Sequence, residues 1–260
     1  MISITSNTLR AKPMKPRVII TGASSGVGLS IAKHLVNLYH PICISRRTHL
    51  VDRALASNCS EYSNYSCDLS CKYEIENILK IILDEHGDVF YLINNAACLT
   101  RQNTMDISIE NLQYAFYLNC LAPILFMRSL LPAMTRQKFG RIINITSGAP
   151  LNCTAGYGIY SSTKAYLNTT TITASKEHME GNIRINLMSP GPVKTEMSPE
   201  ATLLPDICLP TLNYLLDDNE NIPTGIFAWL GYRVPLVPEL SGVDWLAGTQ
   251  DSCLEALSHD

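Results

Sequence analysis

Short runs of apolar, often β-branched residues alternate along the chain with longer stretches in which apolar residues recur every three or four positions. The short runs predict strands at 17–20, 41–45, 62–67, 89–94, 140–147, 182–189 and 226–231. The longer stretches predict helices near 27–38, 71–86, 108–137 and 157–180, and a short helix at about 205–217. Strands that alternate with helices predict an α/β fold in which a parallel sheet carries helices on both faces.

The chain shows no linker, repeat or low-complexity tract that would divide it into parts. The pattern therefore predicts a single domain over residues 16–231, with an N-terminal extension at 1–15. The remaining residues, 232–260, are expected to form a C-terminal tail that packs on the domain or on a neighbouring subunit. Within the longest helical stretch, Pro123 and Pro132 each remove a backbone donor, so we expect these prolines to kink or end the helix.

Composition and charge narrow the class of partner. The 260 residues carry a formal net charge of −3 without any run of basic residues, so charge gives no reason to expect binding to nucleic acid or to an anionic membrane. The first residues lack the apolar core of a signal peptide, and no uninterrupted apolar run reaches the length of a membrane helix. A small molecule is the better expectation.

The cysteines and histidines argue against other kinds of site. Nine cysteines, an odd number without a CxxC pair, favour reduced thiols and a cytoplasmic protein over a disulfide framework or a zinc site. Six histidines show no HExxH motif or paired ligand spacing, so no metal site is expected. The serine in ITSGAP lacks the GxSxG turn of α/β hydrolases.

A glycine-rich loop, TGASSGVG at 21–28, directly follows the first predicted strand and precedes an apolar helix. Gly22 would permit a tight turn, Gly26 would let the backbone approach a pyrophosphate, and Gly28 would allow the helix to pack closely on the strand. The helix N-terminus would add amide donors and a positive dipole. Glycines after a strand are often only a turn, but this context favours a dinucleotide site.

The end of the second predicted strand indicates which dinucleotide is bound. Sites for an unphosphorylated ribose usually carry an acidic residue there, whereas this chain has Ser45 followed by Arg46 and Arg47. Guanidinium groups suit a 2′-phosphate, so NADP(H) is favoured over NAD(H), although two arginines at a strand end also occur as a solvated edge. Asp68 after the third strand could accept a hydrogen bond from the adenine amino group, or serve as an ordinary turn residue.

Tyr160 and Lys164 stand four residues apart in a predicted helix, which places a phenol and an ammonium on one face. The pair could be a packed ring and a solvated amine, or an acid and the charge that tunes it. Free tyrosine has a pKa of about 10. A nearby ammonium and a positive nicotinamide would lower that pKa by favouring the phenolate, which would bring the group toward the range for efficient proton transfer.

In their order along the chain, these motifs resemble the short-chain dehydrogenases/reductases of the single-domain type. TGASSGVG matches the family's TGxxxGxG loop, NNAA at 94–97 is similar to its NNAG element, and Tyr160 with Lys164 fits its YxxxK motif. The resemblance covers about residues 16–231 and implies a Rossmann-like doubly wound parallel sheet flanked by helices. One departure is Ala97, which replaces the family's glycine and adds a methyl group.

Three further matches extend the resemblance. Ser147 precedes the tyrosine by the family's usual thirteen residues, Asn119 in YLNCLAP fits the helix-borne asparagine, and PGPVKT at 190–195 resembles the segment that contacts nicotinamide. The resemblance implies that Tyr160 is the general acid/base, that Ser147 stabilises the developing charge, and that Lys164 tunes the phenol and binds the nicotinamide ribose. For Asn119 it implies a water that links the lysine to solvent.

The chain is thus expected to be an NADPH-dependent carbonyl reductase, or in reverse an alcohol dehydrogenase, for a small neutral or weakly polar substrate. The alternatives are a related epimerase or dehydratase and a non-catalytic NADP(H)-binding regulator or scaffold. The expected cofactor residues are Gly22, Ser24, Ser25, Gly26, Val27, Gly28, Ser45, Arg46, Arg47, Asp68, Leu69, Asn95, Ala96, Ala97, Tyr160, Lys164, Pro190, Gly191, Val193 and Thr195. The expected substrate pocket uses the segment 148–158, with Ala149, Leu151, Asn152 and Thr154, together with Cys98 and Leu99 and the region 196–215, with Met197, Leu203 and Leu204. By resemblance, a homodimer or homotetramer is expected to form through the helices at 108–137 and 157–180.

Overall fold

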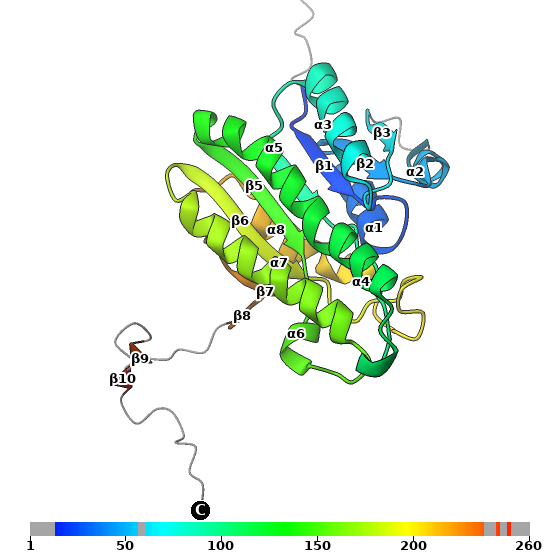
Figure 1. The fold of residues 1–260 in the computed structure, drawn as a ribbon. Helices are drawn as coiled ribbons and strands as arrows, with labels where there is room; N and C mark the ends of the chain where they lie inside the picture. Colours follow the sequence, from blue (N-terminus) through cyan, green and yellow to red (C-terminus); the bar gives the residue numbers. More distant parts are fainter. Residues whose placement is uncertain (1–13, 57–60, 237–242, 245–248, 251–260) are drawn as a thin grey trace, which may run out of the picture.

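The structure is a computed structural model that describes residues 14–56, 61–236, 243–244 and 249–250. An eight-stranded sheet with the order β3-β2-β1-β4-β5-β6-β7-β8 forms the centre of the fold (Figure 1). The strands are β1 (Arg17–Thr21), β2 (His40–Ser45), β3 (Ser63–Ser66), β4 (Tyr91–Asn94), β5 (Phe139–Ile145), β6 (Asn182–Ser189), β7 (Phe227–Trp229) and β8 (Tyr232–Val234). The first seven strands are parallel, and β8 is antiparallel to β7. The predicted parallel sheet is confirmed.

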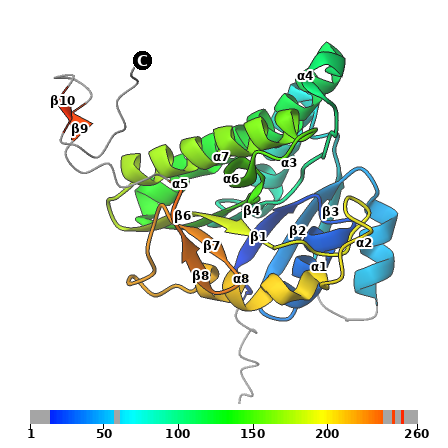
Figure 2. The same ribbon diagram turned by 90° about the horizontal axis from the view of Figure 1, so that it is seen from below.

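Helices cover both faces of this sheet. The helices are α1 (Gly26–Leu35), α2 (Thr48–Leu55), α3 (Lys72–His86), α4 (Ile109–Phe116), α5 (Ala122–Gln137), α6 (Ala149–Asn152), α7 (Gly158–Glu177) and α8 (Leu209–Leu216). Short turns η2 (Thr104–Asp106) and η4 (Pro205–Cys208) and a π-helical turn η3 (Tyr117–Leu121) complete them. Figure 2 shows α3, α4, α5 and α7 on one face and α1, α2 and α8 on the other, which confirms the doubly wound architecture.

Alternate residues of the central strands build two apolar layers, one on each side of the sheet. In β1, Val18 and Ile20 belong to the cluster that packs against α1 and α8, whereas Ile19 belongs to the cluster on the other face. Side chains alternate in this way along any strand, and helices on both faces make every position of a central strand a buried one. The near-continuous apolar runs in the sequence follow from this arrangement.

The stretch from Ile109 to Gln137 forms one helical run in which α4, η3 and α5 follow one another without a break. Pro123 lies in the first turn of α5, where a missing N–H costs little. Pro132 lies inside α5, so the expectation that it ends the helix is wrong. Leu130, Ala133 and Met134 around it are buried, and their packing holds the helical turn that the proline weakens.

By length and composition, the same run is apolar enough to cross a membrane. More than half of its most apolar stretch is buried inside the fold. Phe126, Leu130 and Met134 of α5 belong to the core cluster on that face of the sheet. The apolar character of this run is therefore accounted for by its packing on the sheet.

Helix α2 and strand β8 are among the elements that were not predicted from the sequence. Helix α2 buries only Val51 and Leu55, so its apolar pattern is too short to recognise. The predicted strand 226–231 is shorter, because Leu230 and Gly231 adopt positive φ angles of 46° and 84° and reverse the chain into β8.

Residues 232–234, expected to open a tail, thus belong to the main sheet. Further along, β9 (Val243–Asp244) and β10 (Thr249–Gln250) pair with each other. The expected packing of the rest of the tail, and the extension before Met14, lie outside the described residues.

Candidate functional site

A cavity of about 1130 Å³ lies at the carboxyl ends of the parallel strands. The loops after β1, β2, β4, β5 and β6 all reach it, because the carboxyl ends of parallel strands meet at one edge of the sheet. Of the site residues predicted by name, Gly28, Asn119, Cys98, Leu203 and Leu204 do not line this cavity, whereas Leu99 does. The predicted residues that line it are Gly22, Ser24, Ser25, Gly26, Val27, Ser45, Arg46, Arg47, Asp68, Leu69, Asn95, Ala96, Ala97, Ser147, Ala149, Leu151, Asn152, Thr154, Tyr160, Lys164, Pro190, Gly191, Val193, Thr195 and Met197.

The glycine loop curls around the N-terminus of α1. Gly22 and Gly26 have φ angles of 67° and 53°, a left-handed conformation that glycine adopts without strain. Ser25 is the N-cap residue of α1, and its side chain makes no capping hydrogen bond. The first amides of the helix are therefore directed at the cavity with their dipole, which is the arrangement that binds a phosphate.

Gly28 lies beneath the loop instead of lining the cavity. A Cβ atom at this position would overlap the carbonyl oxygen of Gly22 and the side-chain amide of Asn95. The close approach of helix and strand that was predicted for this glycine is therefore required by the backbone of the loop itself.

Replacing Gly28 with alanine is expected to lower the free energy of unfolding by about 1–3 kcal/mol, the usual cost of forcing extra volume into a packed site. Since the overlap involves Gly22, the loop should also lose its shape and NADPH should bind more weakly. Calorimetry and a fluorescence titration measure the two effects. Gly158→Ala is the control, because no atom lies within 4 Å of a Cβ built there. Wild-type stability and affinity in Gly28→Ala would contradict this account of the loop.

The NNAA element fastens the end of β4 to the glycine loop. The side-chain amide of Asn95 donates to the carbonyl oxygen of Thr21 at 2.9 Å. The backbone amides of Asn95 and Ala96 both donate to the Thr21 hydroxyl, at 2.9 and 3.1 Å. These bonds hold two neighbouring strand ends in one register beside the cavity.

The end of β2 combines two exposed guanidinium groups with a buried hydroxyl. Ser45 lines the cavity, and its buried hydroxyl has no hydrogen-bond partner among the described residues. Arg47 donates to the hydroxyl of Ser25 at 3.0 Å and to the carboxylate of Glu196 at 2.9 Å. Two cations and an unused hydroxyl fit a phosphorylated ribose. The carboxylate beside Arg47 was not anticipated from the sequence.

Asp68 lies in the cavity wall and also shapes its own turn. Its Oδ1 atom accepts hydrogen bonds from the amide and the hydroxyl of Ser70, at 2.9 and 2.7 Å. Burial acts to raise the pKa of Asp68, but these hydrogen bonds and the charge of Arg46 outweigh it, so the pKa is lowered. The carboxylate is thus held in its ionised, hydrogen-bond-accepting form, as the expected contact with adenine requires.

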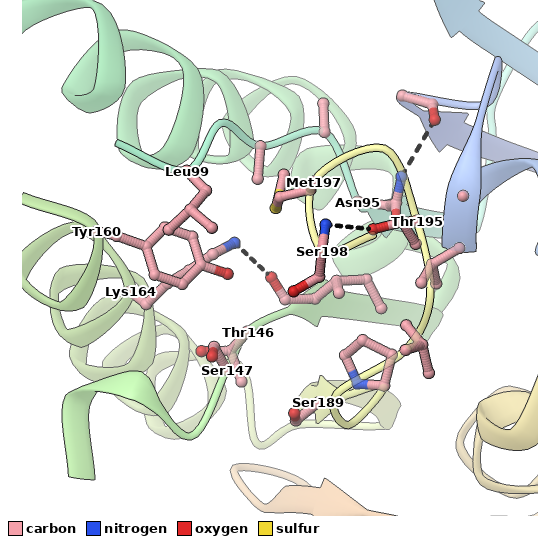
Figure 3. A pocket seen from close by; sticks show the side chains of 18 of the residues that line it. Asn95, Leu99, Thr146, Ser147, Tyr160, Lys164, Ser189, Thr195, Met197 and Ser198 are labelled. Atoms are coloured by element: carbon pink, nitrogen blue, oxygen red, sulfur yellow. Dashed lines mark hydrogen bonds between the residues drawn. The ribbon is translucent and has the colours of Figure 1, made fainter. Parts of the chain in front are cut away.

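Tyr160 and Lys164 extend from α7 into the cavity, where they meet Ser147 from the end of β5 (Figure 3). The Lys164 ammonium donates to the carbonyl oxygen of Ile145 at 2.8 Å and lies 5.8 Å from the centre of the Tyr160 ring. The lysine is only 2% exposed. The serine hydroxyl accepts a hydrogen bond from the amide of Ala149 at 3.1 Å, which fixes its position.

The environment raises the pKa of Tyr160 above its ordinary value. Burial is the main cause, and a hydrogen bond with Ser147 acts in the opposite direction. The lowering expected from Lys164 and a positive nicotinamide together is not seen in the protein alone, since the loss of hydration raises the pKa. At neutral pH the phenol holds its proton and is a hydrogen-bond donor.

Burial has the reverse effect on the lysine and lowers the pKa of Lys164 to about 8. The nearby thiols of Cys120 and Cys98 act weakly in the other direction. The ammonium form therefore persists at neutral pH by a narrow margin. Proton exchange at this amine lies close to the physiological range, which is unusual for lysine.

Replacing Lys164 with methionine is expected to stabilise the protein at pH 7 while it removes activity. The pKa of Lys164 is lower in the folded than in the unfolded chain, so the buried ammonium destabilises the folded state. This destabilisation is complete below about pH 8 and disappears as the pH rises to the pKa of the amine in the unfolded chain. The gain should be about 1–3 kcal/mol at pH 7, since a tenfold change in proton affinity corresponds to about 1.4 kcal/mol. Denaturant unfolding at pH 7 and near pH 10 measures it.

The control for this substitution is Lys176→Met, on an exposed position of the same helix. It should leave stability nearly unchanged at both pH values. A Lys164→Met protein that is less stable than the wild type at pH 7 would show that the amine stabilises the fold.

Asn119 lies in the π-helical turn and is fully buried. Its side-chain amide donates to the carbonyl oxygen of Cys98 at 3.0 Å and to the hydroxyl of Thr163 at 3.0 Å, and its oxygen accepts from the Cys98 amide at 2.9 Å. The side chain thus joins the loop after β4 to α7 and does not reach the cavity. Because its side-chain amide is used in these bonds, the water predicted at Asn119 would have to bind the backbone carbonyl oxygen. In an α-helix that oxygen would accept from the amide of residue 123, which is a proline and has no N–H.

The other end of the cavity has apolar and aromatic walls. Tyr157 before α7 lines this end, and it belongs to the segment 148–158 from which the substrate pocket was expected to form. Sequence reasoning missed Tyr114 of α4, and Phe227, Trp229 and Val234 of the β7–β8 hairpin. The hairpin residues are distant in sequence from every motif, and Tyr114 carries no motif signal of its own. Conversely, Cys98, Leu203 and Leu204 were expected near the substrate but do not line the cavity. The charged lining residues are Arg46, Arg47, Asp68, Lys164 and Glu196.

Comparisons with known proteins agree with this geometry. The family described as short chain dehydrogenase matches residues 16–203. Dehydrogenase/reductase SDR family member 4 of Oryctolagus cuniculus is 29% identical over 199 residues, covering 74% of this chain and 76% of the relative. The 3-oxoacyl-[acyl-carrier-protein] reductase of Bos taurus is 28% identical over 181 residues, covering 69% and 76%.

Solved structures agree as well. A metagenomic short-chain oxidoreductase in complex with NADP superimposes with a TM-score of 0.74 and 26% identity, over 83% of this chain and 98% of the other. The sheet, the glycine loop, the paired tyrosine and lysine, and the family match over most of the chain lead to one conclusion. The chain belongs to the short-chain dehydrogenase/reductase family of oxidoreductases.

Proposed function

We propose that the protein is an NADPH-dependent oxidoreductase that transfers a hydride between nicotinamide and the carbonyl or alcohol carbon of a small, neutral or weakly polar substrate. The observation that carries this proposal is the shared cavity of about 1130 Å³. Tyr160, Ser147 and Lys164 line it together with a phosphate-binding loop and two arginines.

The residues around the loop would hold the cofactor along the strand ends. The amides at the N-terminus of α1 would bind the pyrophosphate, and Asp68 would accept from the adenine. Lys164 would bind the nicotinamide ribose, and the segment from Pro190 to Thr195 would contact the nicotinamide. When bound, NADPH supplies the hydride.

The three polar side chains at the end of β5 and on α7 have separate tasks in reduction. Ser147 donates a hydrogen bond to the substrate carbonyl oxygen, because its oxygen accepts from Ala149 and its proton can pass from the hydrogen bond with Tyr160 to the substrate. Tyr160 gives its proton to the same oxygen as negative charge develops there. Lys164, protonated below about pH 8, stabilises the phenolate that remains. In oxidation the proton moves in the opposite direction.

A preference for NADP(H) is supported by the charge at the end of β2. Arg46 and Arg47 are exposed at the cavity, and no carboxylate stands at Ser45 to accept from a ribose hydroxyl. The related metagenomic oxidoreductase was crystallised in complex with NADP. A 2′-phosphate is the one group that distinguishes this cofactor, and guanidinium groups bind phosphate well.

The walls of the substrate end support an uncharged substrate. Tyr114, Tyr157 and Trp229 provide aromatic surface, and Leu151 and Met197 provide apolar surface. Apart from Lys164, which takes part in the reaction, no cationic side chain of the described residues lines this end of the cavity. A multiply charged acyl carrier would therefore find no partner among the described lining residues.

Incubation of the purified protein with NADPH and a panel of carbonyl compounds tests the proposal. We expect oxidation of NADPH and formation of the alcohol with at least one neutral ketone or aldehyde. Tight binding of NADPH without turnover across the panel would favour the non-catalytic alternative. A change of configuration with no net consumption of NADPH would favour the epimerase.

The proposal includes association of identical subunits through α4 and α7. These helices expose Leu112, Phe116 and Tyr166, and Tyr117 of the adjoining η3 is exposed as well. The rings of Phe116 and Tyr166 pack edge to face, with their centres 5.5 Å apart. An apolar patch shared by two long helices is suited to a two-fold interface, in which the same surface is used on both partners.

A further inference from the structure

The segment 195–200, which follows β6, crosses the boundary between the two ends of the cavity and is held by an ion pair on each side. Glu196 pairs with Arg47 at 2.9 Å on the cofactor side. Glu200 pairs with Arg101 at 2.9 Å on the substrate side. Both pairs join this segment to loops that follow other strands of the sheet, so they fasten it across the site.

The pair on the cofactor side uses a guanidinium that the proposed function requires. Arg47 donates through both terminal nitrogens, one to each carboxylate oxygen of Glu196, at 3.3 and 2.9 Å. One of these nitrogens also donates to the Ser25 hydroxyl at 3.0 Å. The planar fork that suits a phosphate is therefore already occupied by a carboxylate.

The ion pair is exposed enough to exchange. The side chain of Arg47 is 44% exposed and that of Glu196 is 68% exposed, so solvent screens their attraction. A hydrogen-bonded turn supports the glutamate, because the amide of Ser198 donates to the carbonyl oxygen of Thr195 at 3.2 Å. The carboxylate is thus displaced more easily than the turn that carries it.

The same turn touches the glycine loop. The Thr195 methyl group lies 3.0 Å from the position that a Cβ on Gly26 would occupy. A carboxylate on the next residue therefore stands close to the path of an anionic cofactor. A cofactor with an additional phosphate would therefore meet this carboxylate as a competitor for the guanidinium of Arg47.

We propose that Glu196 is a specificity-determining residue that acts through Arg47 and opposes the binding of a 2′-phosphate. NADP(H) must replace the carboxylate on the guanidinium, whereas NAD(H), with a hydroxyl at that position, leaves the ion pair intact. Glu196 thereby reduces the preference for NADP(H) that Arg46 and Arg47 create. The inference rests on the proposed function, since it requires that nicotinamide cofactors bind in this cavity.

The test compares the affinities of Glu196→Gln and wild-type protein for NADPH, NADH, 2′,5′-ADP and 5′-AMP by calorimetric titration. Removal of the charge should tighten binding of NADPH and 2′,5′-ADP by about three- to tenfold at low salt. Binding of NADH and 5′-AMP should change by less than about twofold. Glu200→Gln is the matched control, because it removes the other ion pair of the same segment. It should leave the affinities for all four ligands unchanged.

A second comparison identifies the route of the effect. In an Arg47→Ala background, Glu196→Gln should gain clearly less for NADPH, because the guanidinium for which the two anions compete is absent. An equal gain for both cofactors, a weaker affinity for NADPH, or an undiminished gain without Arg47 would each overturn the inference. If Glu196→Gln binds both cofactors and keeps the wild-type preference between NADPH and NADH, the inference is overturned and the proposed function is not. If the wild-type protein binds neither NADPH nor NADH, the proposed function is overturned as well.

Discussion

Replacing Tyr160 with phenylalanine is expected to lower the turnover of carbonyl reduction by about 10²- to 10⁴-fold, the usual contribution of a positioned acid. The substitution removes one hydroxyl from a ring that lines the cavity and keeps the packing of α7. Burial raises the pKa of Tyr160, so the wild-type phenol holds the proton that reduction requires. The affinity for NADPH should change by less than about twofold, since a phenyl ring fills the same space.

Tyr157→Phe is the control for this experiment. Tyr157 lines the same cavity and its ring lies 5.2 Å from the guanidinium of Arg101, but it has no lysine one helical turn away. Its substitution should alter KM more than kcat. A Tyr160→Phe protein that keeps more than about a tenth of the wild-type turnover would exclude this phenol as the main proton donor.

Replacing Arg46 and Arg47 together with alanine is expected to weaken binding of NADPH by about 10²-fold or more, because hydrogen bonds between charged groups contribute about 1.5–3 kcal/mol each. Removal of Arg47 also breaks its ion pair with Glu196 at 2.9 Å, so the two anions no longer compete for this guanidinium. Binding of NADH should fall by less than about threefold. The double variant should therefore prefer NADH.

Titration of both cofactors with the double variant measures this change of preference. Arg53→Ala, an exposed position in the last turn of α2, controls for the loss of positive charge near β2. A similar loss of affinity for NADPH and NADH would mean that the arginines hold a part common to both cofactors, and would refute the assignment of the 2′-phosphate.

The sheet is the part of the fold that the sequence predicts best. β6 begins and ends at the predicted residues, and β1, β2, β4 and β5 lie within two residues of the predicted bounds at each end. Central parallel strands are apolar on both faces, so their pattern is dense and has few alternatives. Helix α3, which was predicted to within one residue, also has a clear period of apolar residues, with Ile75, Ile78, Leu79 and Ile82 buried.

Elements at the margins were harder to predict because tertiary contacts decide them. Pro132 stays inside α5 since buried neighbours hold the helix, and local rules do not include those neighbours. The reversal at Leu230 requires a positive φ angle in a leucine, which its sequence does not suggest. The hairpin that follows brings Trp229 and Val234 to the cavity from outside the recognised motifs.

The candidate site divides in the same way. Motif residues such as Gly26, Ser147 and Tyr160 were predicted because their spacing is characteristic, and the structure brings them to one cavity. Glu196 was missed as a partner of Arg47 because the two residues are 149 positions apart and their contact depends on the fold. The rise in the pKa of Tyr160 was also missed, since burial cannot be judged from the four-residue spacing to Lys164.

The central claim is that hydride is transferred in this cavity from the nicotinamide to a carbonyl carbon, and that Tyr160 supplies the proton. Incubation with NADPH deuterated at the transferable position, followed by mass spectrometry of the product alcohol, tests it most directly. The account predicts one deuterium on the former carbonyl carbon with the wild-type protein, and little or none with Tyr160→Phe over the same time. Deuterium transfer by Tyr160→Phe at the wild-type rate, or binding of NADPH with no labelled alcohol from any neutral ketone or aldehyde, would contradict it.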